Sequence, residues 1–413
     1  LDERGEPLRN SIQQNDARAV REIEEVKGAL PQAELFAATG GFTNQQHVLP
    51  RLLWVKRNEP DVWSRIHAVM GSYDYVNYKL TGRKSLEMNW AVESGMFDIR
   101  SRKWLPETFS GFGLAPQWLP EVFESGDIVG EVGAEAAAET GLKAGIPVIA
   151  GSADHVASTL AAGIVEPGEL LIKFGGAGDI LYCTDEIRPV PELFFDYHVC
   201  PGSYLLNGCM ASSGSLVKWY AKEFLQDESP DLFARLDRDA QRVAPGSDGL
   251  IILPYFLGEK TPIFDPEARG VMFGLSLAHK REHIFRAILE SVIYGFRHHI
   301  EIIREKGFEP TAIRATNGGA KSRFWCQIAA DALNADIRSY PSHPGSALGV
   351  AFLAGKTAGV YRSWEQIAGF LTEYRDFRPR KDDAAIYDKS YAIYRKLYEQ
   401  LKPSFRQVNG LYG

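Results

Sequence analysis

The sequence has few cysteines, no long apolar run and no excess of basic residues. Its four cysteines, Cys183, Cys200, Cys209 and Cys326, never show the C-x-x-C spacing. Scattered cysteines of this kind favour reduced core thiols in a cytosolic protein. No apolar stretch reaches the roughly 18 residues of a membrane-spanning helix. The net charge of −7 gives no reason to expect nucleic acid or an anionic membrane as a partner.

The length of the chain predicts two domains, because 413 residues exceed what one hydrophobic core usually serves. Hydrophobic residues make up 45% and charged residues 24%, as in soluble globular proteins. The polar opening "LDERGEPLRN" is not a signal peptide, and without an initiator methionine it looks like a chain entered partway. A turn at 165–168 is the expected linker, so the predicted domains are 1–166 and 167–413.

The two halves differ in their patterns. Residues 16–140 are expected to be mostly helical, with one helix that starts near Pro50 and is stopped by Pro60, and another that ends at Gly82. The second half alternates strands and helices. Its predicted elements are a hairpin around "GGAGD", strands in "SYLLNGCM" and "DGLIILPYF", helices in "SLVKWYAKEFLQ" and "HIFRAILESVIYGFRHHIEIIREK", and a strand-turn-helix in "AIRATNGGAKSRFWCQIAADALN".

The stretch "IPVIAGSADHVASTLAAGI" predicts a strand, a turn at Gly151 and a helix of small residues. Asp154 lies between the strand and the helix, where the helix is expected to begin. An acid there is favoured by the unpaired N–H groups and the dipole of a first helical turn. Taken alone, the stretch favours this structural interpretation over a general base at the mouth of a cleft. His155, by the same standard, is expected to be a packed or surface histidine.

Glycine-bearing turns follow apolar strands at Gly175–Gly178 and Gly318–Gly319. Glycine lets backbone N–H groups approach a phosphate without an intervening Cβ, and α/β sheets bind ligands beyond the carboxyl ends of their strands. No Gly-Lys-Ser/Thr follows "GGAG", so it is not a Walker A loop. The alternative is a tight hairpin that needs positive φ angles. A third polar feature, "GEKT" at 258–261, is either a site element or an exposed turn.

The order of these pieces resembles the FGGY carbohydrate kinase family over nearly the whole chain. The resemblance is carried by "AGSADHVASTLAAGIVEPGELLIKFGGAG", "LPYFLGEKTPIFDPEARG", "NGGAKSRFWCQIAADALNADI" and "GSALGVAFLAG". The spacing is most similar to xylulokinase-type members. It implies an α/β fold, the two-domain actin-like (ribonuclease-H-like) ATPase fold with an interdomain cleft. It also implies phosphorylation of a sugar hydroxyl with ATP and Mg²⁺, most simply of a ketopentose such as xylulose.

The resemblance also assigns site residues. Asp154 matches the catalytic aspartate, which would accept the proton of the attacking hydroxyl. The predicted substrate-binding residues are Asp16, Arg18, Asp154 and His155. The predicted nucleotide-binding residues are Gly175, Gly176, Ala177 and Gly178 in a phosphate loop, and Gly318, Gly319, Ala320 and Lys321 in an adenosine-binding turn. The resemblance leaves the metal ligands and the oligomeric state open, a homodimer included.

Two departures from the family pattern qualify this assignment. The loop "GGAG" lacks the Thr and Ser hydroxyls that the family usually places between its glycines. The family's first phosphate loop and a metal-associated aspartate precede the segment that "LDERGEPLRNSIQQNDAR" matches, so a longer chain is expected. The rival hypotheses are a kinase for another ketose or a polyol, and a sugar-binding regulator with a degenerate ATP site.

Overall fold

The computed structural model describes residues 1–13, 16 and 18–411. The chain forms two compact units, and each consists of three segments. The first unit contains Leu1–Ala161, Asp185–Leu206 and Ser346–Gln366. The second contains Ala162–Thr184, Asn207–Gly345 and Ile367–Gly413. Each unit thus combines parts of both predicted domains, 1–166 and 167–413.

The first unit is mainly helical, with short strands. Its helices are α1 (Val20–Ala29), α2 (Gln32–Thr39), α3 (Val48–Asn58), α4 (Pro60–Trp63), α5 (Ser72–Thr81), α6 (Met88–Glu93), α7 (Pro106–Ser110), α8 (Ala134–Thr140), α9 (Asp154–Ala161) and α14 (Ser346–Thr357). Its strands are β1 (Leu86–Glu87), β2 (Phe97–Asp98), β3 (Lys103–Trp104), β4 (Val122–Phe123), β5 (Ile128–Glu131), β6 (Pro147–Ile149) and β9 (Phe194–Tyr197). The strands pair as β1 with β4, β2 with β3 and β5 with β6.

Local sequence signals explain where several of these helices end. Helix α3 stops just before Pro60, which begins α4 at its first turn, where a missing N–H is tolerated. Helix α5 ends at Gly82, whose φ of 73° is a left-handed cap that favours glycine. Both predicted helices are therefore confirmed. A core of buried apolar residues packs beneath α1 and α3: Val26, Leu49, Leu52, Leu53, Met96, Phe109, Phe112 and Leu114.

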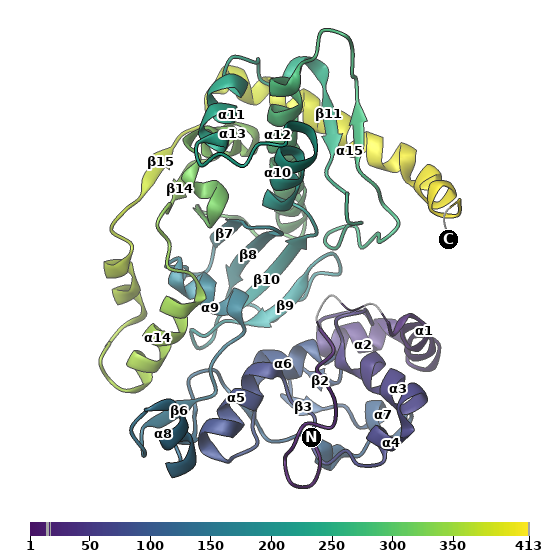
Figure 1. Cartoon of the computed structure of the whole chain (residues 1–413), viewed down its shortest axis with the longest axis vertical. Helices are drawn as coiled ribbons and strands as arrows, with labels where there is room; N and C mark the ends of the chain where they lie inside the picture. The colour runs from purple at the N-terminus through teal and green to yellow at the C-terminus, as the bar shows by residue number, and fades with distance from the viewer. Residues whose placement is uncertain (14–15, 17, 412–413) are drawn as a thin grey trace. The chain divides into compact units, whose positions relative to one another are not determined.

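The second unit contains a mixed sheet and long helices. Its strands are β7 (Glu169–Phe174), β8 (Gly178–Thr184), β10 (Tyr204–Met210, from Asn207 on), β11 (Ile251–Leu253), β12 (Val271–Phe273), β13 (Ala312–Thr316), β14 (Ile337–Ser339) and β15 (Arg375–Phe377). Its helices are α10 (Gly214–Tyr220), α11 (Leu232–Ala240), α12 (Arg281–Glu305), α13 (Arg323–Leu333) and α15 (Lys381–Asn409). Within this unit the sheet runs β15-β14-β13-β7-β8-β10. Helix α12 contacts β8 and packs against α11 and α13 (Figure 1).

The elements predicted for the second half of the chain are present. Strands β7 and β8 form the expected antiparallel hairpin, with Phe174 opposite Gly178. Strand β13 lies parallel to both β7 and β14, so its carboxyl end reaches the same edge of the sheet as that of β7. This topology brings the turn after β7 and the turn after β13 to one edge, although more than a hundred residues separate them in the chain.

None of the helices that the structure describes combines the length and the apolar character needed to cross a bilayer. The four cysteines form no disulfide. Three of them, Cys183, Cys200 and Cys326, are buried, and Cys209 is partly buried.

Candidate functional site

Asp154 is the first residue of α9 and follows the loop after β6. That loop is fixed to its surroundings, because the side-chain amide of Asn77 donates to the carbonyl oxygens of Ile149 (3.2 Å) and Ala150 (2.7 Å). Gly151 has a φ of 87°, a left-handed conformation that glycine adopts without strain. The loop thus sets the point at which α9 begins, and with it the place of the Asp154 carboxylate.

The Asp154 side chain is 88% exposed, which leaves its carboxylate accessible to a reactant. Its Oδ1 lies 3.6 Å from Nδ1 of the His155 ring. The sequence alone favoured a structural interpretation of this acid, and its place in the first turn of α9 fits that interpretation, while the exposed carboxylate also allows a chemical role. Its catalytic role remains a prediction at this point.

His155 lies between carboxylates that come from three elements of the first unit. Its Nε2 is 3.1 Å from Oδ2 of Asp196 in β9 and 3.8 Å from Oε1 of Glu93 in α6. Asp196 is only 1% exposed, whereas Glu93 reaches solvent. Burial acts to lower the pKa of His155, but the charges of Asp196 and Asp154 outweigh it and raise that pKa well above its usual value. The ring is therefore an imidazolium at neutral pH, and it is largely packed, as the sequence suggested.

Sequence reasoning did not identify Glu93 or Asp196. Neither belongs to a recognisable motif, and each lies far from residue 155 in the chain. The only hint of this cluster in the sequence is at His155, which directly follows the acid Asp154. Which carboxylates meet that ring depends on the packing of α6, α9 and β9, and only the tertiary structure supplies it.

Asp16 and Arg18, the predicted sugar-side residues, bind each other. The Arg18 guanidinium donates to both carboxylate oxygens of Asp16, at 2.9 and 2.7 Å, and lies 4.7 Å from the centre of the Trp54 ring. The hydrogen bonds from Arg18 lower the pKa of Asp16 to about 2. Arg51 experiences the negative charges of both Asp16 and Glu93. Arg51 therefore links this pair electrostatically to the cluster around His155, although contact with sugar stays a prediction.

The two glycine turns of the second unit lie together. A Cβ added at Gly175 would be 3.2 Å from the Asn317 side-chain amide, so the turn after β7 touches the turn after β13. A Cβ at Gly176 would meet nothing within 4 Å, and one at Gly318 only the carbonyl oxygen of Phe174 at 3.9 Å. The structure therefore brings the predicted phosphate loop and the predicted adenosine turn to one place with open backbone on both.

Buried hydroxyl groups surround these turns without partners among the residues that the structure describes. They are Oγ of Ser213, Oγ of Ser215 and Oγ1 of Thr316. The backbone N–H groups of Ser213 and Ser215 donate to the carbonyl oxygen of Gly176, at 2.9 and 3.1 Å. The start of α10 thus brings serines against a loop that has no hydroxyl of its own. Sequence reasoning missed them, because "SSGS" lies nearly forty residues downstream.

The backbone of Asn317 is strained. Its φ of 71° and ψ of −165° fall in a region that is open essentially to glycine. Such strain persists only where the surroundings impose it, and it concentrates at ligand-binding sites. Asn317 is therefore a further candidate site residue, beside the two glycine turns, that sequence reasoning did not identify.

The remaining residues of the predicted adenosine turn differ in their surroundings. A Cβ at Gly319 would lie 2.6 Å from Cβ of Phe174 and 2.6 Å from the Trp325 ring. Packing against the protein itself therefore requires glycine here, whatever else binds. Ala320 is fully buried and its carbonyl oxygen accepts the Ser339 hydroxyl at 2.7 Å, whereas Lys321 is exposed.

The polar "GEKT" segment forms hydrogen bonds within the second unit. Glu259 is buried, and its carboxylate accepts the backbone N–H groups of Ala211 (2.6 Å) and Lys260 (2.8 Å). The Thr261 hydroxyl accepts the N–H of Cys209 at 2.6 Å. These bonds fix the end of β10, so the segment is a structural element and not an exposed turn.

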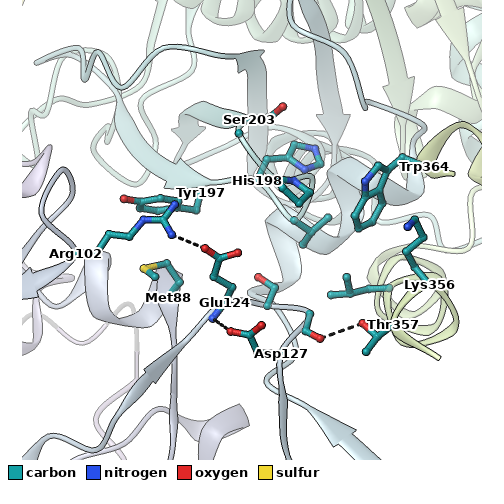
Figure 2. A pocket seen from close by; sticks show the side chains of 16 residues that line it. Met88, Arg102, Glu124, Asp127, Tyr197, His198, Ser203, Lys356, Thr357 and Trp364 are labelled. Atoms are coloured by element: carbon teal, nitrogen blue, oxygen red, sulfur yellow. Dashed lines mark hydrogen bonds and ion pairs between the residues drawn. The ribbon is translucent and has the colours of Figure 1, made fainter. Parts of the chain in front are cut away.

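A cavity of about 370 Å³ lies in the first unit, apart from all predicted site residues. Arg102, Tyr197, His198, Lys356 and Trp364 are among the residues that line it, and Figure 2 shows their side chains around it. Arg102 binds Glu124, and the Thr357 hydroxyl donates to the carbonyl oxygen of Gly126 at 3.0 Å.

The only group of three potential metal ligands among the described residues is Glu93, His155 and Asp196. This donor set does not fit Mg²⁺, which takes oxygen ligands in near-ideal octahedral geometry. One of the three donors is an imidazole, and both of its nitrogens already contact carboxylates. The described part of the chain thus offers no prepared protein cage for that ion.

Comparison with known proteins gives matches along the chain. The FGGY family of carbohydrate kinases matches with its N-terminal domain over residues 1–161 and with its C-terminal domain over residues 184–358. A xylulose kinase of Lactococcus lactis is 30% identical over 412 residues, which cover 99% of this chain and 81% of the relative.

Solved structures show the same likeness. The xylulose kinase from Rhodospirillum rubrum superposes with a TM-score of 0.92 at 41% identity, covering 98% of this chain and 82% of that one. A gluconate kinase from Lactobacillus acidophilus superposes with a TM-score of 0.90 at 26% identity, covering 99% and 83%. These likenesses confirm the predicted α/β fold, the two-domain actin-like ATPase fold.

Proposed function

Because the chain belongs to the FGGY family of carbohydrate kinases, we propose that it phosphorylates a ketopentose such as xylulose, with Asp154 as the general base. The enzyme class, a sugar kinase that uses ATP, follows from the family. The observation that carries the role of Asp154 is its exposed carboxylate at the start of α9, held beside a charged histidine. Phosphoryl transfer needs mainly an oriented nucleophile, and a carboxylate within reach of the hydroxyl supplies that orientation and accepts its proton.

We assign the ATP phosphates to the open backbone of the β7–β8 turn and the neighbouring turn after β13. Gly176 faces open space, which lets a phosphate approach the backbone N–H groups. The orphaned hydroxyls of Ser213 and Ser215 fit the same role, because a buried donor without a partner is costly unless a ligand satisfies it. They provide the hydroxyls that "GGAG" lacks, which argues against a regulator with a degenerate ATP site.

A glycine substitution tests the nucleotide site without disturbing the fold. Gly176→Ala has room for its methyl group and no left-handed φ, so it should fold normally. We expect the KM for ATP to rise about tenfold, or about 1.4 kcal/mol, because the methyl group occupies the space of a phosphate. Gly369→Ala, also open and also without a left-handed φ, is the matched control and should leave the KM unchanged. Equal behaviour of the two variants would remove the β7–β8 turn from the site.

The choice of sugar rests on the relatives and on the charge near Asp154. Two of the relatives described above are named xylulose kinases and one a gluconate kinase. Glu93, Asp154 and Asp196 place three carboxylates around one histidine, which disfavours a negatively charged sugar acid. ADP release should therefore be fastest with a neutral ketopentose in a screen of ketoses, polyols and gluconate. Turnover with gluconate alone would refute this choice, and ADP release independent of any sugar would refute the kinase assignment of the site.

Two further expectations accompany this proposal. We expect Mg²⁺ to enter with the nucleotide, since it keeps several waters and is usually held through phosphates and one or two carboxylates. We also expect a cytoplasmic location, because the four cysteines are scattered along the chain and never show the C-x-x-C spacing.

A further inference from the structure

An exposed catalytic carboxylate has a problem of orientation. A side chain that is 88% exposed has few neighbours to restrict its rotamers, yet a general base must meet the reacting hydroxyl within hydrogen-bond reach. A misplacement of 1 Å can cost about a hundredfold in rate. The His155 ring, with Nδ1 at 3.6 Å from Oδ1 of Asp154, is placed to limit the motion of that carboxylate.

Both nitrogens of the His155 ring face carboxylates. Nδ1 is 3.6 Å from Oδ1 of Asp154, and Nε2 is 3.1 Å from Oδ2 of Asp196. A carboxylate accepts hydrogen bonds and does not donate them, so the contact with Asp196 calls for a proton on Nε2, and the nearby Asp154 carboxylate favours a second proton on Nδ1. The resulting imidazolium attracts both acids at once, and it bridges a buried carboxylate to an exposed one.

The buried end of this bridge is firmly held. Asp196 is 1% exposed and lies in β9 next to Tyr197. The backbone N–H of Tyr197 donates to the Asn89 side chain at 2.7 Å, and the Asn89 amide donates to the Tyr197 carbonyl oxygen at 3.0 Å. Asn89 belongs to α6, the helix that also carries Glu93. Strand β9 and helix α6 are thus joined right beside the cluster.

The backbone of His155 is fixed as well. Its carbonyl oxygen accepts the hydroxyl groups of Ser158 (2.9 Å) and Thr159 (2.8 Å). Helix α9 also lies unusually close to α14, because a Cβ added at Gly349 would be 1.9 Å from the carbonyl oxygen of Ala157. The ring therefore extends from a rigid helix toward a rigid strand.

The geometry points to His155 as the positioning residue of Asp154, with Asp196 as its buried anchor. This inference rests on the proposed role of Asp154 as general base. Glu93 lies on the same side of the ring, at 3.8 Å from Nε2, and desolvation raises the pKa of its carboxyl group to about 7. His155 acts by restricting the motion of the Asp154 carboxylate.

A double-mutant cycle tests the inference. In the wild-type background, His155→Asn should lower kcat about 10- to 100-fold, with the KM values for sugar and ATP changed less than about twofold. In the Asp154→Asn background, the same substitution should have no further effect, because there is no base left to position. Asp196→Asn should reproduce the loss, and adding His155→Asn to it should change little.

The controls separate this inference from the proposed function and from damage to the fold. His198→Asn alters another buried histidine, two residues beyond Asp196, and should keep wild-type kcat. A loss of kcat in His198→Asn as large as that in His155→Asn would overturn the inference, and so would an undiminished effect of His155→Asn in the Asp154→Asn background. Full activity of Asp154→Asn would instead refute the proposed base. A normal kcat of His155→Asn beside an inactive Asp154→Asn would refute the positioning role alone.

Discussion

Two histidines in this protein lie in largely buried positions but differ in charge, because one ring is protonated and the other is neutral. His155, in the first unit, lies between Asp154 and Asp196 and is held charged. His299, in α12 of the second unit, is fully buried, and its pKa is lowered to about 4 by burial. Carboxylates decide the first case, and their absence among the hydrogen-bond partners decides the second.

The partners of His299 form a chain that needs a neutral ring. Its Nδ1 lies 2.8 Å from the carbonyl oxygen of Gly295, which can only accept, so Nδ1 carries the proton. Its Nε2 then accepts from the Thr261 hydroxyl at 2.9 Å, and that hydroxyl accepts the N–H of Cys209. Each polar group in this series of hydrogen bonds has a partner within the protein. Around His155, by contrast, the Asp154 carboxylate faces solvent, which leaves it available for chemistry.

The largest effect is expected on the charged side of this comparison. Asp154→Asn keeps the shape of the side chain but removes the proton acceptor. Turnover should fall about 10²- to 10⁴-fold, the usual contribution of a general base, while sugar binding is largely retained. Steady-state kinetics with calorimetric sugar binding checks this. Unchanged turnover would leave Asp154 with only its structural interpretation as an acid in a first helical turn.

A substitution beside the neutral His299 should lower the free energy of unfolding and leave kcat unchanged. Thr261→Val leaves Nε2 of His299 and the N–H of Cys209 buried without partners. Each orphaned group costs about 1–3 kcal/mol, so the free energy of unfolding should fall by about 2–6 kcal/mol. Chemical denaturation measures the loss, and kcat per folded molecule should stay near the wild-type value. A stable but inactive variant would contradict the structural role of this segment.

The pH dependence sharpens the contrast, because the two histidines have shifts of opposite sign. The pKa of His299 is lower in the folded protein than its usual 6.5, so its contribution to stability is present above pH 6.5 and is lost as pH falls toward 4. The stability difference between wild type and His299→Gln should therefore shrink by about 2 kcal/mol from pH 7.5 to 5.

His155 should show the reverse trend. Its folded pKa is raised, so its contribution is complete below pH 6.5 and is lost as pH rises through the folded pKa. The difference between wild type and His155→Asn should thus decrease toward alkaline pH. Urea unfolding at a series of pH values checks both variants. Parallel trends would show that the two environments are not as different as the contacts indicate.

The smallest effect is expected at the exposed pair of Asp16 and Arg18. The guanidinium of Arg18 is largely engaged by Asp16 and Trp54, which leaves little of it for a sugar. Arg18→Gln should raise the KM for sugar less than tenfold and leave the melting temperature unchanged. Competition kinetics with the preferred ketose measures this. A large rise in KM would mean that the pair opens toward the substrate when sugar binds.

The sequence by itself determined the features that depend on neighbours in the chain. Pro60 and Gly82 marked helix ends, the alternation around "GGAGD" predicted the β7–β8 hairpin, and the order of the motifs indicated the family. These signals are local, because a helix stop or a tight turn depends on the φ angle and hydrogen bonds of a few consecutive residues. The family likeness also supplied the role expected of Asp154.

Only the tertiary structure decided which distant groups meet. Asp196 and Glu93 reach His155 because β9, α6 and α9 pack together. Ser213 reaches the glycine loop because α10 begins beside it, and Gly319 is required by the Phe174 and Trp325 side chains. None of these contacts has a signature in sequence spacing. The charge of a histidine depends on the carboxylates within a few ångströms of its ring, and side-chain packing alone determines which ones those are.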